Sequence, residues 1–319
     1  MPRATDGIRH HRRMSEPETL HDPWLIAVWP GMGGVAISAG YYLMAKLGMH
    51  LLAELPANGY FEHDHIEIKD GLVVRKRLPR SRLFVWQDPR QHHDLVLFIG
   101  EAQPVVRGGD FSRKLVEHAS SLGVSRVFTF AAMATRMRPA SESHVFGAAV
   151  DKETLADLDT IGIHLMKQGE ISGLNGVLLG TAAAAGMRGG CLLGEIPHVF
   201  SQIPFPKASL AVLGAFTRLT SVPLDFRELR EHAQSVERTL EAFLERMEQA
   251  AAGHEPEAEA TPEASEPPRP GAADRHHVEQ LFESARNDRS RAYELKQELD
   301  RLGLFAEYED RFLDLFKES

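Results

Sequence analysis

The sequence predicts an α/β fold of three layers, in which a central mixed, mostly parallel sheet is flanked by helices and followed by a C-terminal helical arm. Two observations predict the core. Apolar runs of strand length alternate with amphipathic runs of helical spacing along most of the chain. Several strand runs are apolar on both faces, as strands are when helices cover both sides of a parallel sheet. The arm is predicted because helical spacing returns after a segment rich in Pro, Glu and Ala.

Shifts in composition divide the chain of 319 residues into four segments. Residues 1–22 are basic and polar, and we expect them to form a disordered lead. Residues 23–250 carry the strand and helix patterns of the α/β domain. Residues 251–274 hold few large apolar side chains, so we expect a disordered linker. Residues 275–319 are expected to form an amphipathic helical arm that can move as a unit.

The elements of the first half follow in order. Trp24 begins a buried strand that ends at Pro30-Gly31, and a helix over 35–48 follows, with Gly48 as its C-terminal stop. The next strand runs are bounded by turn residues, and one of them alternates and turns back at an Asp-Gly pair. These predicted strands lie at 50–55, 65–74, 82–87, 94–104 and 125–133, with a helix at 110–123 after the fourth.

The second half continues the alternation. A helix is predicted at 152–158, a helix of small residues at 176–186 and a buried strand at 189–197. From 206 to 250 the pattern is helical, with a break at 221–223, where a proline follows a serine and a valine. The last part of this region is long, charged and amphipathic.

The overall composition excludes several classes of function. The net charge of -9 gives no electrostatic footprint for nucleic acid or for an anionic membrane surface. One cysteine builds neither a disulfide framework nor a thiolate zinc site, which suits a reducing cytoplasm. The N-terminal stretch lacks the apolar region of a secretory signal. No apolar run reaches the roughly 18 residues that a membrane-spanning helix needs.

The first strand–helix turn resembles a dinucleotide-binding fingerprint. Gly31, Gly33 and Ala36 fit the pattern G-x-G-x-x-A, and Glu54 lies near the end of the next strand. However, Pro30 sits inside the turn, and sharp strand–helix turns use glycine for conformational reasons alone. We therefore predict no tight binding of NAD or FAD, and leave a structural turn or another ligand as the alternatives.

The stretch GEISGLNGVLLG, residues 169–180, is a second glycine-rich turn. Ser172 has glycines at the wrong positions for a nucleophile elbow, and no lysine completes a P-loop. What remains is a turn at a helix N-terminus, where backbone N–H groups can hold an anion. The preferred interpretation is close packing of the helix on the sheet through its small residues, with an anion or small-ligand pocket as the alternative. The small residues are Gly176, Gly180, Ala183 and Ala184.

Two glutamates, Glu101 and Glu195, each follow an apolar strand, at the edge where open α/β sheets bind ligands. Two carboxylates there can serve acid–base chemistry, but helix capping or pairing with Arg107, Arg136 or Arg188 is preferred. Together with the two glycine turns they define a candidate ligand pocket. Its residues are Gly31, Gly33, Gly34, Glu101, Ser172, Gly173, Asn175 and Glu195.

Some of the histidines are candidate ligands of a metal site. His63 and His65 lie on one face of a predicted strand, and His92-His93 lies in a loop. Two histidines on one strand do not form a site without a third ligand, so a solvated strand face is preferred. We predict no metal, no cofactor and no catalytic residue.

Several stretches together resemble the proteasome assembly chaperone 2 family, in its prokaryotic branch. They are WLIAVWPGMGGVAISAGYYLMAKLG, DLVLFIGEAQP, GEISGLNGVLLG, GGCLLGEIPH and LKQELDRLGLFAEYEDRFLDLF. The resemblance covers nearly all of residues 23–250, and the arm is similar to the tail of bacterial members. It implies a core similar to the purine nucleoside phosphorylases, although a fold does not confer its relatives' chemistry. It also implies a non-catalytic role with a proteasome-related partner.

The C-terminus departs from the family pattern. Proteasome binders of this kind often end in a hydrophobic–tyrosine–any tripeptide, whereas this chain ends Lys317-Glu318-Ser319 and its late tyrosine, Tyr308, is internal. This departure argues against docking to a proteasome through the C-terminus.

The preferred function is therefore protein binding in the cytoplasm, as a factor resembling assembly chaperones. The alternatives are a small-ligand protein or hydrolase that acts on a nucleoside or an anion, and a structural homo-oligomer with neither role. An aromatic stripe on the arm is expected to bury against its own core, a second copy or a partner protein, where large aromatics anchor helices. Its residues are Phe305, Tyr308, Phe312 and Phe316.

Overall fold

The computed structural model describes most of the chain. The described residues are 9–10, 19–57, 59–61, 66–69, 71–75, 77–104, 106–253 and 271–317. His63 and His65, and most of the predicted lead and linker, lie outside them.

A mixed sheet of nine strands in the described residues forms the middle layer, in the order β1-β3-β6-β7-β2-β8-β11-β9-β10. Its four central strands run parallel to one another, and antiparallel pairs flank them. The central strands are β7 (Leu95–Gly100), β2 (Trp24–Val28), β8 (Arg126–Thr135) and β11 (Arg188–Pro197). The flanking strands are β1 (Arg9–His10), β3 (His50–Leu55), β6 (Ser81–Trp86), β9 (Val145–Ala149) and β10 (His164–Leu165).

The described residues of the predicted run at 65–74 form two paired strands that stand apart from the main sheet. They are β4 (Ile66–Lys69) and β5 (Leu72–Arg75), which pair antiparallel with each other. The alternating pattern and the Asp-Gly turn thus predicted the pairing, but not that the two strands form a sheet of their own.

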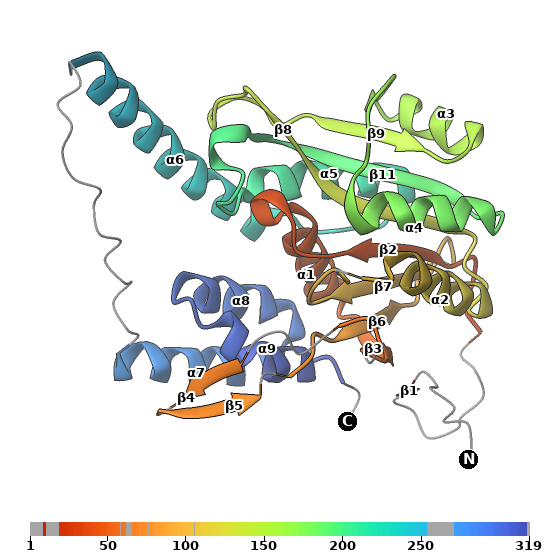
Figure 1. Ribbon diagram of the computed structural model, residues 1–319, viewed down its shortest axis with the longest axis horizontal. Coiled ribbons are helices and arrows are strands. Elements are labelled where there is room, and N and C mark those ends of the chain that lie inside the picture. Colours follow the sequence, from red (N-terminus) through yellow and green to blue (C-terminus); the bar gives the residue numbers. More distant parts are fainter. Residues whose placement is uncertain are drawn as a thin grey trace.

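Helices cover both faces of the sheet, which confirms the three-layer prediction (Figure 1). On one face, α2 (Gly108–Ser121) and α4 (Gly173–Ala184) bury leucine and phenylalanine side chains in one hydrophobic cluster. On the other face, α1 (Val35–Leu47) and α5 (Pro206–Thr220) belong to a second cluster. The helix α3 (Lys152–Thr160) packs beside β9.

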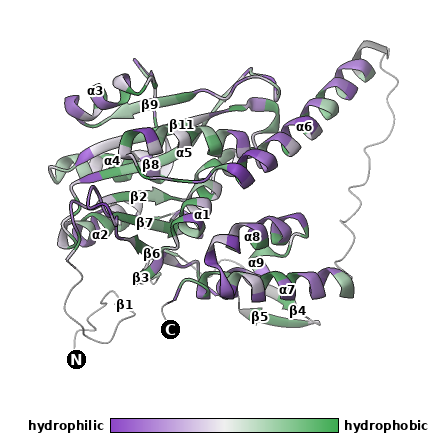
Figure 2. Ribbon diagram, turned by 180° about the vertical axis from the view of Figure 1, so that it is seen from behind, coloured by the Kyte–Doolittle hydropathy of each residue, from purple (hydrophilic) through white to green (hydrophobic). Residues whose placement is uncertain are grey.

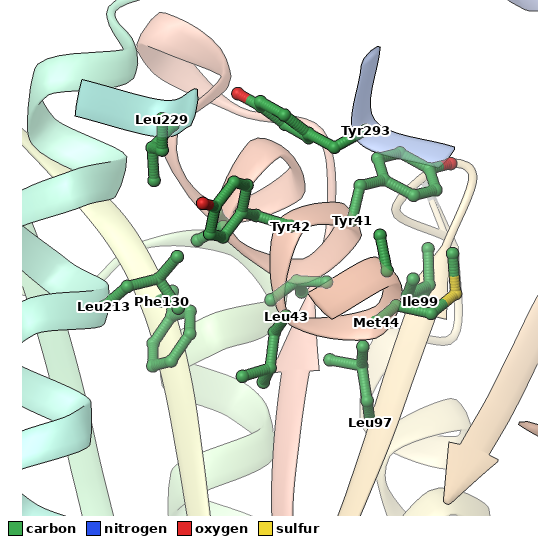
Figure 3. Packing of buried hydrophobic residues seen from close by; sticks show 14 of the residues in the cluster. Tyr41, Tyr42, Leu43, Met44, Leu97, Ile99, Phe130, Leu213, Leu229 and Tyr293 are labelled. Carbon is green, nitrogen blue, oxygen red and sulfur yellow. The ribbon is translucent and has the colours of Figure 1, made fainter. Parts of the chain in front are cut away.

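The helix α1 lies at the centre of the second cluster. Met44 lies beside Leu97 and Ile99 of strand β7, whereas Tyr42 points toward Leu213 of α5 (Figure 3). Gly40 allows the close approach of the helix to the sheet, because a Cβ there would lie 2.6 Å from Cγ2 of Val28. The helix ends at Gly48, whose φ of 59° is left-handed, as the sequence predicted.

A long helix, α6 (Arg227–Gly253), follows α5 after the predicted break. Ser221 has a φ of 58° there and ends α5. The first part of α6 packs on α5, and its last turns extend beyond the body of the domain (Figure 2). None of the helices within the described residues is both long and apolar enough to cross a bilayer.

The C-terminal arm consists of α7 (Ala272–Asn287), α8 (Ala292–Arg301) and α9 (Phe305–Asp314), and it docks on the chain's own core. Phe312 and Phe316 have no exposed surface and belong to the same cluster as α1. The main-chain N–H of Leu51 in β3 donates to the carbonyl of Phe316 over 2.8 Å. In this conformation the aromatic stripe therefore packs intramolecularly.

Candidate functional site

The first glycine turn, between β2 and α1, is filled by the chain itself. Gly33 has a φ of 60°, its N–H donates to the carbonyl of Ser201 over 2.7 Å, and its own carbonyl accepts from Phe205. A Cβ at Gly33 would lie 3.3 Å from the side chain of Ile196. The amide that a pyrophosphate needs is thus already bonded to protein. Gly34 is also left-handed, and a Cβ at Gly31 would meet no atom within 4 Å.

Gln103 connects the two glycine turns, a role that the sequence did not reveal. Its amide nitrogen donates to the carbonyl of Pro30 over 3.3 Å, and its amide oxygen accepts from the N–H of Leu174 over 3.0 Å. A Cβ at Gly173 would lie 2.9 Å from that oxygen. Only the position of Gln103 in the sequence could have indicated this role, since the residue follows β7 at the edge of the sheet where both turns lie. The structure therefore brings Gly31 to Gly34 near the start of α4, with a protein side chain between them.

The helix α4 uses its small residues differently from the prediction. Gly176 does make a close approach, because a Cβ there would lie 2.1 Å from the carbonyl oxygen of Ile171. A Cβ at Gly180 would meet no atom within 4 Å, and Ala183 and Ala184 are exposed. Three leucines and one alanine form the buried face of α4 instead, because they recur at the spacing of one helix face. They are Leu174, Leu178, Leu179 and Ala182.

The other two α4 candidates are placed at its first turn. Ser172 is the N-cap residue, is exposed, and makes no side-chain capping bond. The Asn175 amide donates to the carbonyl of Phe130 over 3.4 Å.

An open pocket of about 580 Å³ lies beside α4 rather than at the predicted position. It is formed by the end of β9, the segment before α4 and one side of α4. Within the described residues, its lining includes Gly169, Gly176 and Lys167 but none of the eight candidate ligand residues. The apolar part of the lining comes from Met166, Ile171, Val177 and Leu179.

Glu101 belongs to an ion-pair network. Its carboxylate accepts from Arg77 at 2.5 Å, from the main-chain N–H of Arg80 at 2.9 Å and from Arg82 at 3.3 Å. The prediction that Glu101 pairs with arginines is correct in the type of partner, but the arginines that it named are not the ones that Glu101 contacts. Arg107 instead pairs with Asp110, and Arg188 pairs with Glu153.

Glu195 belongs to a second network, at the end of β11. Thr135 donates to one carboxylate oxygen over 2.7 Å, and the other lies 2.9 Å from Nδ1 of His144. Burial raises the pKa of Glu195, but the hydrogen bonds from Thr135 and His144 outweigh it and hold the pKa below its usual value.

The two glutamates do not face each other. Three strand steps separate β7 and β11, which places the ends of the two strands roughly 14 Å apart at the usual spacing of ~4.8 Å per strand. Paired carboxylates that work as acid and base in glycoside hydrolysis lie about 5–9.5 Å apart. The geometry therefore does not support an acid–base pair made of Glu101 and Glu195.

Comparison with known proteins identifies the family to which this chain belongs. A model of the PAC2 family matches residues 25–244. The chain belongs to the PAC2 family. This membership confirms the resemblance to the proteasome assembly chaperone 2 proteins. The matched region ends within α6, so the C-terminal arm of this PAC2 protein lies beyond the family model.

Solved structures share the fold of this PAC2 chain. PbaB of Pyrococcus furiosus, described as an archaeal proteasome activator, is 24% identical with a TM-score of 0.62, over 74% of this chain and 98% of that one. A PAC2 family protein of Streptomyces avermitilis is 27% identical with a TM-score of 0.60, over 69% and 95%. A proteasome-assembly chaperone homologue of Mycobacterium tuberculosis is 24% identical with a TM-score of 0.60, over 73% and 97%.

Among curated proteins, an uncharacterised protein of Methanocaldococcus jannaschii is 25% identical to this PAC2 chain over 254 residues, which are 78% of this chain and 94% of that protein.

Proposed function

We propose that this PAC2 protein is a non-catalytic protein-binding factor that assists the assembly of a protein complex in the cytoplasm. Its relatives include a proteasome activator and a proteasome-assembly chaperone homologue, which supports a proteasome-related partner. The engagement of Glu101 and Glu195 in separate networks supports a role without catalysis.

The observation that carries the proposal is an exposed apolar surface at the carboxyl ends of the central strands. We call it the edge patch. The 3-10 turns 32–34 and 198–200 meet there through the bond between Gly33 and Ser201, and Phe200 contacts Phe243 of α6 with 6.1 Å between ring centroids. Exposed apolar patches of this kind mark protein-interaction sites. The exposed members are Met32, Val199, Ile203, Phe243 and Met247.

The helix α6 explains why part of the patch is unburied. Apolar residues recur along it at alternating steps of four and three, the spacing of a helix-packing seam. The early seam residues pack within the domain, but Phe243 and Met247 are 50% and 54% exposed. The seam thus continues past the surface that covers it. Its residues are Leu229, Ala233, Val236, Leu240, Phe243 and Met247.

The projecting end of α6 is braced from its opposite side. Arg138, in the loop after β8, donates to Glu241 and Glu248, each over 2.8 Å. These two glutamates are seven residues apart and share one helix face, whereas Phe243 and Met247 lie on the other. The brace therefore presents the apolar face to solvent on a supported helix, which limits the entropy lost when a partner binds.

The second candidate function, small-ligand binding, is favoured only by the open pocket beside α4. Lys167 on its rim suits an anion or a nucleoside phosphate. Calorimetric titration with nucleosides and nucleotides tests this alternative. Saturable binding that is lost in the variant Val177→Trp, which narrows the pocket, would support it over the protein-binding role.

Reconstitution tests the proposed function. Proteasome α and β subunits of the same organism are mixed with the full-length protein, and the rate of ring assembly is followed on native gels. We expect wild type to accelerate assembly and the variant Phe243→Asp/Met247→Asp to lose that effect. Glu245→Gln, on the far side of α6, is the matched control and should retain it. Equal rates with and without the wild-type protein would refute the proposal.

A further inference from the structure

An acidic pair on α9 meets three arginines of the core. Asp310 lies 3.1 Å from Arg77, 3.2 Å from Arg80 and 3.0 Å from Arg82, and Glu309 lies 3.7 Å from Arg77. The arginines come from the segment that leads from the β4–β5 pair into β6. We call this group, Arg77, Arg80 and Arg82, the arginine socket.

Each arginine of the socket also has a carboxylate from the core itself. Arg77 and Arg82 contact Glu101 at 2.5 and 3.3 Å, and Arg82 and Arg80 approach Glu54 at 3.6 and 4.0 Å. Removing one partner of a buried ion pair is costly when the other charge is left alone. Here the departure of α9 leaves no arginine of the socket without a carboxylate. The arrangement thus permits reversible docking, even though Arg82 is almost fully buried.

Aromatic contacts lie beside the ion pairs and fix the position of α9 along the core. Phe312 packs edge-to-face on Tyr41 of α1 with 5.7 Å between ring centroids, and Phe316 packs on Phe84 of β6 at 6.3 Å. Phe312 lies on α9 two residues after Asp310, and Phe316 lies two residues beyond the end of α9, so one short segment carries the whole set of contacts. The core therefore recognises a pattern: an acidic pair followed by two aromatic residues that are four positions apart.

We propose that the arginine socket, with Tyr41 and Phe84, is a binding site for an acidic amphipathic helix of a protein partner, and that the chain's own α9 occupies it as a competitor. The proposal rests on the proposed protein-binding function and names the chemistry of one partner segment. Charge complementarity selects the occupant, since three arginines face the incoming helix and large aromatics serve as its anchors. The arm lies beyond the region that the family model matches, so the competitor is an addition to the PAC2 domain.

Peptide binding to the full-length protein tests the proposal. The probe is a fluorescent peptide of residues 304–317, followed by anisotropy at low salt. Asp310→Arg places a positive charge against the socket and should release α9, so we expect it to bind the peptide at least tenfold more tightly than wild type. Asp314→Arg makes the same charge change at an exposed position of α9 and should match wild type. A peptide with asparagine at 310 should bind at least tenfold more weakly.

A second measurement covers the case in which Asp310→Arg does not fold. Hydrogen exchange of α9 amides in the wild-type chain should accelerate when excess unlabelled peptide is added, while exchange in α1 stays unchanged. Equal peptide affinity for wild type and folded Asp310→Arg, or equal affinity of the peptides with aspartate and with asparagine at 310, would overturn the proposal. So would concentration-dependent dimers with exchanged arms, because the occupant would then be a second copy. None of these variants touches the edge patch, so failure here is distinct from failure in the assembly assay.

Discussion

The hydroxyl of Tyr41 in α1 donates to the carboxylate of Glu309 in α9 over 3.0 Å, across 268 positions of sequence. Burial, followed by the nearby Glu101, raises the pKa of Glu309 above its usual value, and the partners Tyr41, Arg77 and Arg82 offset this only in part. Burial also raises the pKa of Tyr41 well above its usual range. The contact that joins the arm to the core therefore favours a neutral carboxyl.

Glu309→Gln should stabilise the protein at alkaline pH. A carboxyl with a raised folded pKa contributes stability below its unfolded pKa and loses it as the pH rises through the folded pKa. Glutamine keeps an oxygen for the Tyr41 hydroxyl and never ionises. We expect its melting temperature to exceed that of wild type by about 2–4 °C at pH 8 and to equal it at pH 4. Calorimetry at both pH values measures this, with exposed Glu307→Gln as the control. A lower melting temperature at pH 8 would contradict the assignment.

Phe312→Ala should destabilise the whole domain. The side chain has no exposed surface and packs against Tyr41, so its removal leaves a cavity worth about 3–5 kcal/mol. Phe243→Ala removes the same group from a half-exposed position and should cost less than about 1 kcal/mol. Urea unfolding compares the two. Similar costs for both variants would indicate instead that the arm contributes little to the stability of the core.

Two glycine-to-alanine substitutions in helices should change the free energy of unfolding in opposite directions. Gly40→Ala forces a Cβ to 2.6 Å from Val28 and should destabilise by about 1–3 kcal/mol. Gly180→Ala meets no atom within 4 Å and should stabilise by about 0.5–1 kcal/mol through helix propensity. Denaturant midpoints separate them, and a destabilised Gly180→Ala would show that the outer face of α4 is covered in solution.

NAD(H) and FAD should not bind with micromolar affinity. The N–H of Gly33 is bonded to Ser201, and Gln103 occupies the space between the first turn and α4. Calorimetric titration checks this expectation. Saturable binding that disappears in Glu54→Ala would show that the fingerprint of the first turn is functional.

Ser172 should not react with a fluorophosphonate probe, and Ser172→Ala should leave the fold intact. The serine is exposed at the start of α4 and makes no side-chain capping bond. Mass spectrometry after labelling locates any adduct. Stoichiometric modification of Ser172 would show that the turn activates a nucleophile.

The sequence predicted the layers of this protein better than its contacts. The buried strands at β2 and β7 and the break between α5 and α6 follow from local patterns, because apolar runs and helix-breaking residues act over short distances. The pairing of Asp310 with Arg82 could not be predicted, because 228 positions separate the two residues and nothing local selects a partner. An amphipathic pattern shows that α9 buries one face, but not which surface covers it.

The same limit applies to the candidate site. Glu101 and Glu195 were placed at the correct edge of the sheet by the rule for parallel strands. The distance between them depends on the order of the strands in the sheet, which could not be predicted from the sequence. Gln103 was overlooked because a single glutamine carries no recognisable motif, although its position after β7 was available.

The bond between Leu51 and Phe316 has a consequence for synthesis on the ribosome. Leu51 emerges early, and its partner is made 265 residues later. At translation rates of about 5–20 residues per second, the helix that covers the surface around Tyr41 and Phe84 is made roughly 13–53 s after Leu51. Throughout that interval the nascent chain displays an aromatic surface beside three arginines. The core of this chain is therefore completed only when its own last helix is made.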